Sequence, residues 1–141
     1  MPVIQYSKRD LLRDKVVSPS WYKVLIESVG EWTPSADKQS QNLAIESTIV
    51  CNADDGSVEF ADVPIGGLGT WSFNSKAMGF SLGLVKALAP QFGMNADEID
   101  DKTRIELKQA EGKMIELFVD NNLYEGRMRN KVNHKYRALR S

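Results

Sequence analysis

The chain has 141 residues, 42% of them hydrophobic, and a single cysteine, Cys51. This length supports one domain with a real core rather than two. A lone cysteine excludes an internal disulfide framework and a cysteine metal quartet. The first fifteen residues carry charges where a signal peptide needs an apolar run, and no stretch of eighteen apolar residues occurs. We therefore expect a cytoplasmic protein without a membrane segment.

Charge is distributed unevenly along the chain. Residues 124–141 hold six of the 18 basic residues and one of the 19 acidic residues, so their net charge is +5, against −6 for residues 1–123. Such asymmetry indicates a localised site for an anionic partner, often nucleic acid. A basic end that only keeps the protein soluble would give the same pattern.

The first half of the chain is typical of strands. We expect residues 1–20 to form an N-terminal arm, in which Ser7 can cap one helical turn, ahead of a single domain over residues 21–141. Residues 21–32 and 42–53 alternate between two faces as strands do, and a polar loop separates them. A turn at 54–56 and a third strand at 57–65 would complete an antiparallel meander.

A helix is predicted after a glycine-rich connection at residues 66–75. Asn74 or Ser75 is placed to cap it, and apolar residues then recur at helical spacing: Met78, Leu82, Val85 and Leu88. Gly79 and Gly83 lie four residues apart, which would permit close packing against the sheet.

The last part of the chain is predicted to be a strand pair. After an acidic, polar segment at 95–113, residues 113–126 fit a strand, and a basic segment follows at 127–137. Period-two spacing would place its basic residues on one face of a strand: Arg127, Arg129, Lys131, Lys135 and Arg137. A helix also fits in part, because four residues fall at helical spacing: Met128, Val132, Tyr136 and Leu139.

Three strands, a helix and a strand pair indicate a mainly β fold. This is the chain order of an oligonucleotide/oligosaccharide-binding (OB) β-barrel, a five-stranded Greek-key barrel with one helix between strands three and four. Other small α+β domains share the same order.

The sequence offers little for catalysis. His134 is the only histidine, which excludes a multi-histidine metal site and weakens any catalytic triad. Cys51 lacks a basic neighbourhood, and the acids of residues 95–101 lack the calcium-loop pattern. The glycines at 66–69 lack the Lys-Ser/Thr ending of a P-loop. We predict no enzyme, no metal site and no cofactor.

The signals for binding single-stranded nucleic acid are stronger. Such sites combine a basic groove that follows the phosphates with aromatic side chains on which bases stack. The predicted phosphate contacts are the five basic residues of 127–137, extended by Lys23 and Lys76. The candidate stacking residues are Trp32, Trp71, Phe73, Tyr124 and Tyr136, with a place in the core as the alternative for each. The aromatic residues expected in the core are Trp21, Phe60, Phe80 and Phe118.

Three stretches of the chain are similar to a phage and prophage family of small proteins encoded beside replication and recombination functions. These are "SKRDLLRDKVVSPSWYKVLI", "TWSFNSKAMGF" and "EGKMIELFVDNNLYEGRMRNKVNHKYR". The resemblance implies an OB-like fold and single-stranded DNA binding. Its matching positions are Trp71, Phe73, Asn74 and Lys76 in the middle stretch and Arg127, Asn130, Asn133, Lys135 and Arg137 in the last.

Sequence-tolerant binding of single-stranded DNA in phage DNA replication or recombination, without catalysis, is therefore the leading hypothesis. The expected partners are single-stranded DNA and other phage replication or recombination proteins, and the protein could form a homo-oligomer. The alternative is a phage accessory or structural module whose basic strand binds an acidic protein. A small nuclease is the third hypothesis, and the lack of an acid or histidine cluster speaks against it.

Overall fold

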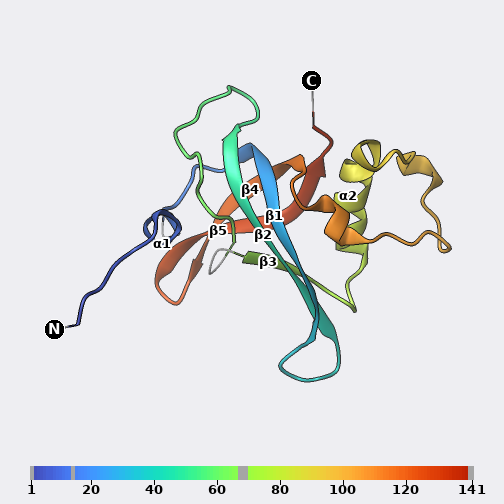
Figure 1. Cartoon of the computed structure of the whole chain (residues 1–141), viewed down its shortest axis with the longest axis horizontal. Coiled ribbons are helices and arrows are strands. Elements are labelled where there is room, and N and C mark those ends of the chain that lie inside the picture. Colours follow the sequence, from blue (N-terminus) through green and yellow to red (C-terminus); the bar gives the residue numbers. More distant parts are fainter. Residues whose placement is uncertain (1, 14, 67–69, 140–141) are drawn as a thin grey trace.

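Five antiparallel strands form one sheet in this protein, whose computed structural model describes residues 2–13, 15–66 and 70–139 without the side chain of Phe80. The strands are β1 (Ser20–Pro34), β2 (Gln41–Asn52), β3 (Thr70–Asn74), β4 (Met114–Tyr124) and β5 (Arg127–Arg137). Their order across the sheet is β3-β2-β1-β4-β5 (Figure 1). The predicted strands at 21–32, 42–53 and 113–126 are confirmed.

Short helices flank the sheet. They are α1 (Lys8–Leu12), α2 (Gly79–Leu88) and three 3-10 turns: η2 (Ala89–Phe92), η3 (Ala96–Glu98) and η4 (Leu107–Ala110). Of the helices that the structure describes, none has the length and apolar content needed to cross a membrane.

Alternation along the strands builds the core. On β2, Leu43, Ile45 and Ile49 are buried while Ala44, Glu46, Thr48 and Val50 are not, as the period of two requires. Ser47 shares this buried face, and its Oγ accepts a hydrogen bond of 2.8 Å from Trp71 Nε1 on β3. A buried polar group therefore has a partner, which it needs away from water.

The predicted third strand at 57–65 is wrong, because the third strand of the sheet is β3 at Thr70–Asn74. Residues 57–65 form turns and a single bridge between Pro64 and Thr48. Asp62 has a φ of 68°, which breaks an extended chain. Residues 63–65 are buried without forming a strand, since short apolar stretches reach the core equally well from a loop.

The helix α2 begins later than predicted and buries a different face. Met78, not Asn74 or Ser75, is its N-cap, and Asn74 Oδ1 instead accepts a hydrogen bond from the Lys76 backbone N–H. Among the described side chains of α2, the buried ones are Leu84, Ala87 and Leu88. The predicted apolar face is therefore only partly in the core, since Met78 and Leu82 are exposed.

Close packing of α2 against the sheet is confirmed at Gly83 and not at Gly79. A Cβ atom added at Gly83 would lie 3.0 Å from Cδ2 of Tyr136 on β5, whereas one added at Gly79 would meet nothing within 4 Å. The helix thus approaches β5 closely at one glycine.

Aromatic rings bring the two edge strands of the sheet together. The rings of Trp71 and Phe73 on β3 lie 5.9 Å from Tyr136 and 5.4 Å from His134 on β5, measured between centroids. No backbone ladder joins β3 to β5 in the described residues, so the sheet is open. The predicted five-stranded, mainly β architecture with a helix between strands three and four is confirmed, and closure into a barrel is not seen.

The N-terminal segment is attached to the sheet through Asn130. Ser7 caps α1 as predicted, in a capping box with Asp10. Further along, Val17 is fully buried, and its backbone N–H donates to Asn130 Oδ1 at 2.9 Å. Asn130 Nδ2 donates to the carbonyl of Lys15, also at 2.9 Å. Residues 15–17 are thereby fixed against β5.

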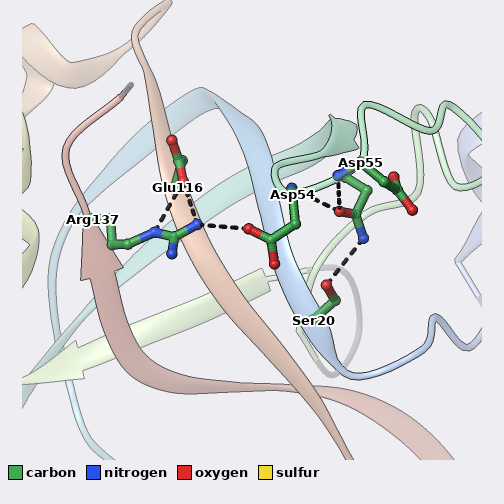
Figure 2. Close-up of polar contacts among 6 residues, drawn as sticks. Ser20, Asp54, Asp55, Glu116 and Arg137 are labelled. Carbon is green, nitrogen blue, oxygen red and sulfur yellow. Dashed lines mark hydrogen bonds and ion pairs between the residues drawn. The ribbon is translucent and has the colours of Figure 1, made fainter. Parts of the chain in front are cut away.

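A buried ion pair joins β4 to β5. Glu116 is 2% exposed, and its Oε1 accepts hydrogen bonds from Nε and Nη2 of Arg137 at 3.0 and 2.6 Å. Figure 2 shows the same guanidinium reaching Asp54 Oδ1, at 3.3 Å. The other side of this guanidinium lies 4.0 Å from the ring centroid of Trp21.

Replacing Arg137 with alanine should therefore destabilise the protein, because it removes the guanidinium that hydrogen-bonds the buried Glu116 carboxylate. Truncating one partner of a buried pair costs roughly 3–5 kcal/mol, and the lower end applies since Arg137 is partly exposed. The free energy of unfolding in urea, compared between the variant and the wild type, measures this loss. The double variant Glu116→Leu/Arg137→Met should recover most of the loss, and an Arg137→Ala variant as stable as the wild type would contradict the role of the pair.

Candidate nucleic-acid interface

The basic segment is a strand, which settles the alternative left open by its sequence. Arg127–Arg137 forms β5, paired antiparallel with β4. Glu125 and Gly126 connect the two strands with φ angles of 49° and 78°. Positive φ at both central residues is the mark of a type I′ hairpin turn. The helical interpretation of 127–137 is therefore wrong.

The basic residues of β5 share one face of the hairpin, as predicted. Arg127, Arg129 and Lys131 lie opposite Tyr124, Asn122 and Asp120 of β4. Arg137 lies opposite Glu116, and the Lys135 ammonium is 5.4 Å from the Phe118 ring centroid. Because residues opposite each other point to the same side of a sheet, all five belong to one face, here called the outer face.

A bulge in β5 preserves this arrangement. Val132 pairs with Val119 and Tyr136 with Leu117, so β5 takes four steps where β4 takes two. His134 lies in this bulge with a φ of 56°. An insertion of two residues keeps the alternation in phase, whereas one residue would have moved Lys135 and Arg137 to the opposite face.

Tyr124 is the predicted stacking residue that the structure places beside the basic residues. Its side chain is 51% exposed, and the Arg129 guanidinium lies 4.0 Å from its ring centroid. One side of the ring is thus covered by a cation. A base could stack on the other side.

The outer face also carries an aromatic pair that the sequence interpretation assigned to the core. Trp21 and Phe118 are half-buried, and their rings meet edge to face at 5.6 Å. Lys135 and Arg137 lie over these rings. Arg137 is a weaker candidate for binding phosphate than the other four, because its guanidinium already pairs with Glu116 and Asp54.

Trp71 and Phe73 are buried, so their assignment as stacking residues is wrong. They are 6% and 2% exposed. Both lie on β3, which pairs with β2, and their rings pack on each other and on His134 and Tyr136. Tyr136 is likewise held between α2 and β3. A strand occupies what the sequence indicated to be a polar connection, and its two aromatic residues fill the core.

Trp32 and Lys76 lie away from the hairpin. Trp32 is 39% exposed and lines an apolar groove of about 550 Å³ between β1, α2 and residues 99–108, together with Met78 and Leu82. Lys76 follows β3 next to the start of β2. Within β1, the part that pairs with β4 is residues 20–25, at the end opposite Trp32. Trp32 and Lys76 therefore do not join the outer face.

A pocket at the edge of β5 adds residues that sequence interpretation missed. It has a volume of about 430 Å³ and lies between the N-terminal segment and the hairpin, whose tip is beside α1 in Figure 1. This pocket, here called the edge pocket, is lined by Arg13, Lys15, Val16, Gly66, Tyr124, Glu125, Arg127, Met128, Arg129 and Asn130. Arg13 and Lys15 alternate with acids in the sequence, so no charge pattern marks them.

In the part of the chain that the structure describes, no three His, Cys, Asp or Glu side chains are grouped so that they could hold a metal ion. Cys51 is a half-buried free thiol. Comparison of the chain with protein-family models and with curated proteins finds no match. The outer face and the edge pocket are therefore the features that point to a function.

Burial lowers the pKa of His134 below its ordinary value of 6.5. The imidazole lies among Trp71, Phe73 and Tyr136, and its Nδ1 is 2.7 Å from the Tyr136 hydroxyl. Removal from water disfavours the charged imidazolium. The same burial raises the pKa of the Tyr136 hydroxyl. Both groups are thus neutral at pH 7.

This shift predicts a pH dependence of stability. The unfolded chain binds a proton at His134 near pH 6.5, whereas the folded protein binds it only at lower pH. The neutral imidazole therefore contributes its full share of the folding stability above pH 6.5, and this share is lost as the pH falls through the folded pKa. Urea unfolding at pH 7.5 and 5.5 measures the loss. It should be smaller in a His134→Asn variant, since asparagine does not titrate and tolerates a positive φ. Equal losses in both proteins would contradict this assignment.

Proposed function

We propose that this protein binds single-stranded DNA, without catalysis and with little sequence preference, in phage DNA replication or recombination in the cytoplasm of the infected cell. The observation that carries the proposal is the outer face of the β4–β5 hairpin, where Arg127, Arg129 and Lys131 stand in a row beside the exposed ring of Tyr124. A row of cations with an aromatic platform can hold phosphates and stack bases, whatever the base sequence.

The architecture supports the same proposal. The order β3-β2-β1-β4-β5, with a helix before β4, is the order of an OB barrel opened between its third and fifth strands. Aromatic contacts already bring β3 and β5 together. The resemblance to the phage family, which includes the hairpin, agrees with an OB-type single-stranded DNA-binding protein.

The exposed ring of Tyr124 supports binding to single strands rather than to duplex DNA. The Tyr124 side chain is exposed, and an unpaired base can stack on it, whereas bases inside a duplex are already stacked on their neighbours. The cations reach phosphates and carry no information about sequence. Fluorescence polarisation with labelled dT, dA and duplex oligonucleotides tests this preference, and tighter binding to the duplex would overturn it.

Removing the row of cations should weaken binding and flatten its salt dependence. Each phosphate contact on a single strand contributes about −0.7 to the slope of log K against log [salt]. The triple variant Arg127→Ala/Arg129→Ala/Lys131→Ala should therefore lose about two from the magnitude of that slope, measured by polarisation between 50 and 200 mM NaCl. The control is Lys86→Ala/Lys102→Ala/Arg104→Ala, which removes three exposed charges elsewhere. Equal binding by both triple variants would refute the role of the hairpin.

Tyr124 should contribute by stacking. Tyr124→Ala is expected to lower the affinity by roughly 1–3 kcal/mol, or about 5- to 150-fold, without changing the salt slope, because stacking releases no counterions. Tyr124→Phe keeps the ring and should bind as the wild type does. Trp32→Ala, in the apolar groove, is the matched control. A loss for Trp32→Ala alone would move the site to that groove.

The alternative function uses the same outer face. An acidic protein partner would also meet Arg127, Arg129 and Lys131, and would not need Tyr124 as a platform. Protein that ignores all oligonucleotides, yet forms a complex that the triple variant abolishes, would support this alternative.

A further inference from the structure

The edge pocket is the feature of the molecule that the proposed function leaves unexplained. Four of its described lining residues are basic and one, Glu125, is acidic. They come from two distant parts of the chain, the segment after α1 and the tip of the β4–β5 hairpin. Its volume of about 430 Å³ is within the range of ligand sites. Like charges repel one another across such a pocket, so an anion between them would be stabilised.

Arg129 supplies a direct sign of a missing partner. Its Nε atom is buried and has no hydrogen-bond acceptor among the described residues. A buried donor without a partner costs about 1–3 kcal/mol, and more when it is charged. Arg129 also lines a second, smaller pocket along β5, where Lys131 and Asn122 lie. The residue that carries the unsatisfied donor therefore lines both the edge pocket and the smaller pocket beside Lys131.

Arg13 is the residue of the N-terminal segment best placed to share that anion. It is the C-cap of α1, and its backbone N–H donates to the Arg9 carbonyl at 3.0 Å. The two hydrogen bonds of Asn130 fix the chain at Lys15 and Val17 just beyond it.

The ammonium group of Lys15, by contrast, points elsewhere. It lies 3.4 Å from the Glu59 carbonyl oxygen and 5.4 Å from the Phe60 ring centroid. The arginines that line the edge pocket are Arg13, Arg127 and Arg129. Guanidinium groups suit a phosphate, because two parallel N–H donors match two of its oxygens.

We propose that the edge pocket is a phosphate-binding subsite of the single-stranded DNA interface, in which Arg13 binds the same phosphate group as Arg127 and Arg129. This inference rests on the proposed function and adds to it a contact from outside the hairpin. The phosphate lies next to the Tyr124 ring, so the subsite holds the phosphate of the nucleotide whose base stacks there. The strand then passes between α1 and the hairpin tip.

The test compares Arg13→Ala with Arg104→Ala, an exposed arginine in the segment before η4 that gives the same charge change far from the hairpin. Full-length proteins bind fluorescent dT oligonucleotides between 50 and 200 mM NaCl. Arg13→Ala should weaken binding about fivefold to tenfold at the lowest salt and reduce the magnitude of the salt slope by about 0.7, the value for one phosphate on a single strand. Arg104→Ala should match the wild type.

The source of the phosphate is distinguished by using oligonucleotides with and without a 5′-phosphate. An equal loss on both assigns the subsite to an internal phosphodiester, and a loss on the phosphorylated oligonucleotide alone assigns it to a strand end. If Arg13→Ala binds like Arg104→Ala while the hairpin triple variant is impaired, the subsite is refuted and the proposed function stands. If the wild type binds no oligonucleotide, the proposed function itself fails.

Discussion

The register of β5 against β4 decides which side chains of this protein can meet a ligand. Because a one-residue slip reverses the two faces of a strand, the cations of β5 would have pointed into the core under any odd register. The bulge at His134 adds two residues and keeps Arg127, Lys135 and Arg137 on the outer face. The same bulge turns the His134 ring toward Phe73. The side chains of β5 thus contribute both to the core, through His134, and to the outer face, through the cations.

A second constraint connects the two ends of the chain. Asn130 is buried on β5, and its amide satisfies one donor and one acceptor of the N-terminal segment, at Val17 and Lys15. A buried amide with both groups paired fixes a position, because any displacement would leave polar atoms unsatisfied. Arg13 is therefore brought to the hairpin by a contact that involves no charge.

Much of the architecture could be predicted from local pattern. Alternation along 21–32, 42–53 and 113–126 gave strands, since a sheet with one buried face imposes a period of two on its residues. The third strand could not be predicted in this way. Residues 57–65 resemble a strand as well as Thr70–Asn74 does, and the choice depends on which of them pairs with the edge of β2 at residues 42–46. That pairing is a long-range property.

The residues of the candidate site could likewise be predicted from the sequence only in part. The five basic residues of β5 and Tyr124 were recognisable from spacing and composition, whereas Trp71 and Phe73 were not recognisable as core residues beside Gly67 and Gly69 in the sequence. Exposure of an aromatic ring is decided by what packs on it, here the opposite edge strand and Ser47.

The sequence by itself determined that the chain is mainly β, that its cations gather near one end, and that alternate positions of 127–137 carry them. These are local properties of spacing and charge. The tertiary structure decided that the basic segment is a strand rather than a helix, that Arg137 pairs with Glu116, and that Arg13 lies beside Arg127 and Arg129. The reason is physical, since these features depend on contacts that local spacing does not show: the pairing of β5 with β4, an ion pair between residues 21 positions apart, and a pocket lined by residues more than a hundred positions apart.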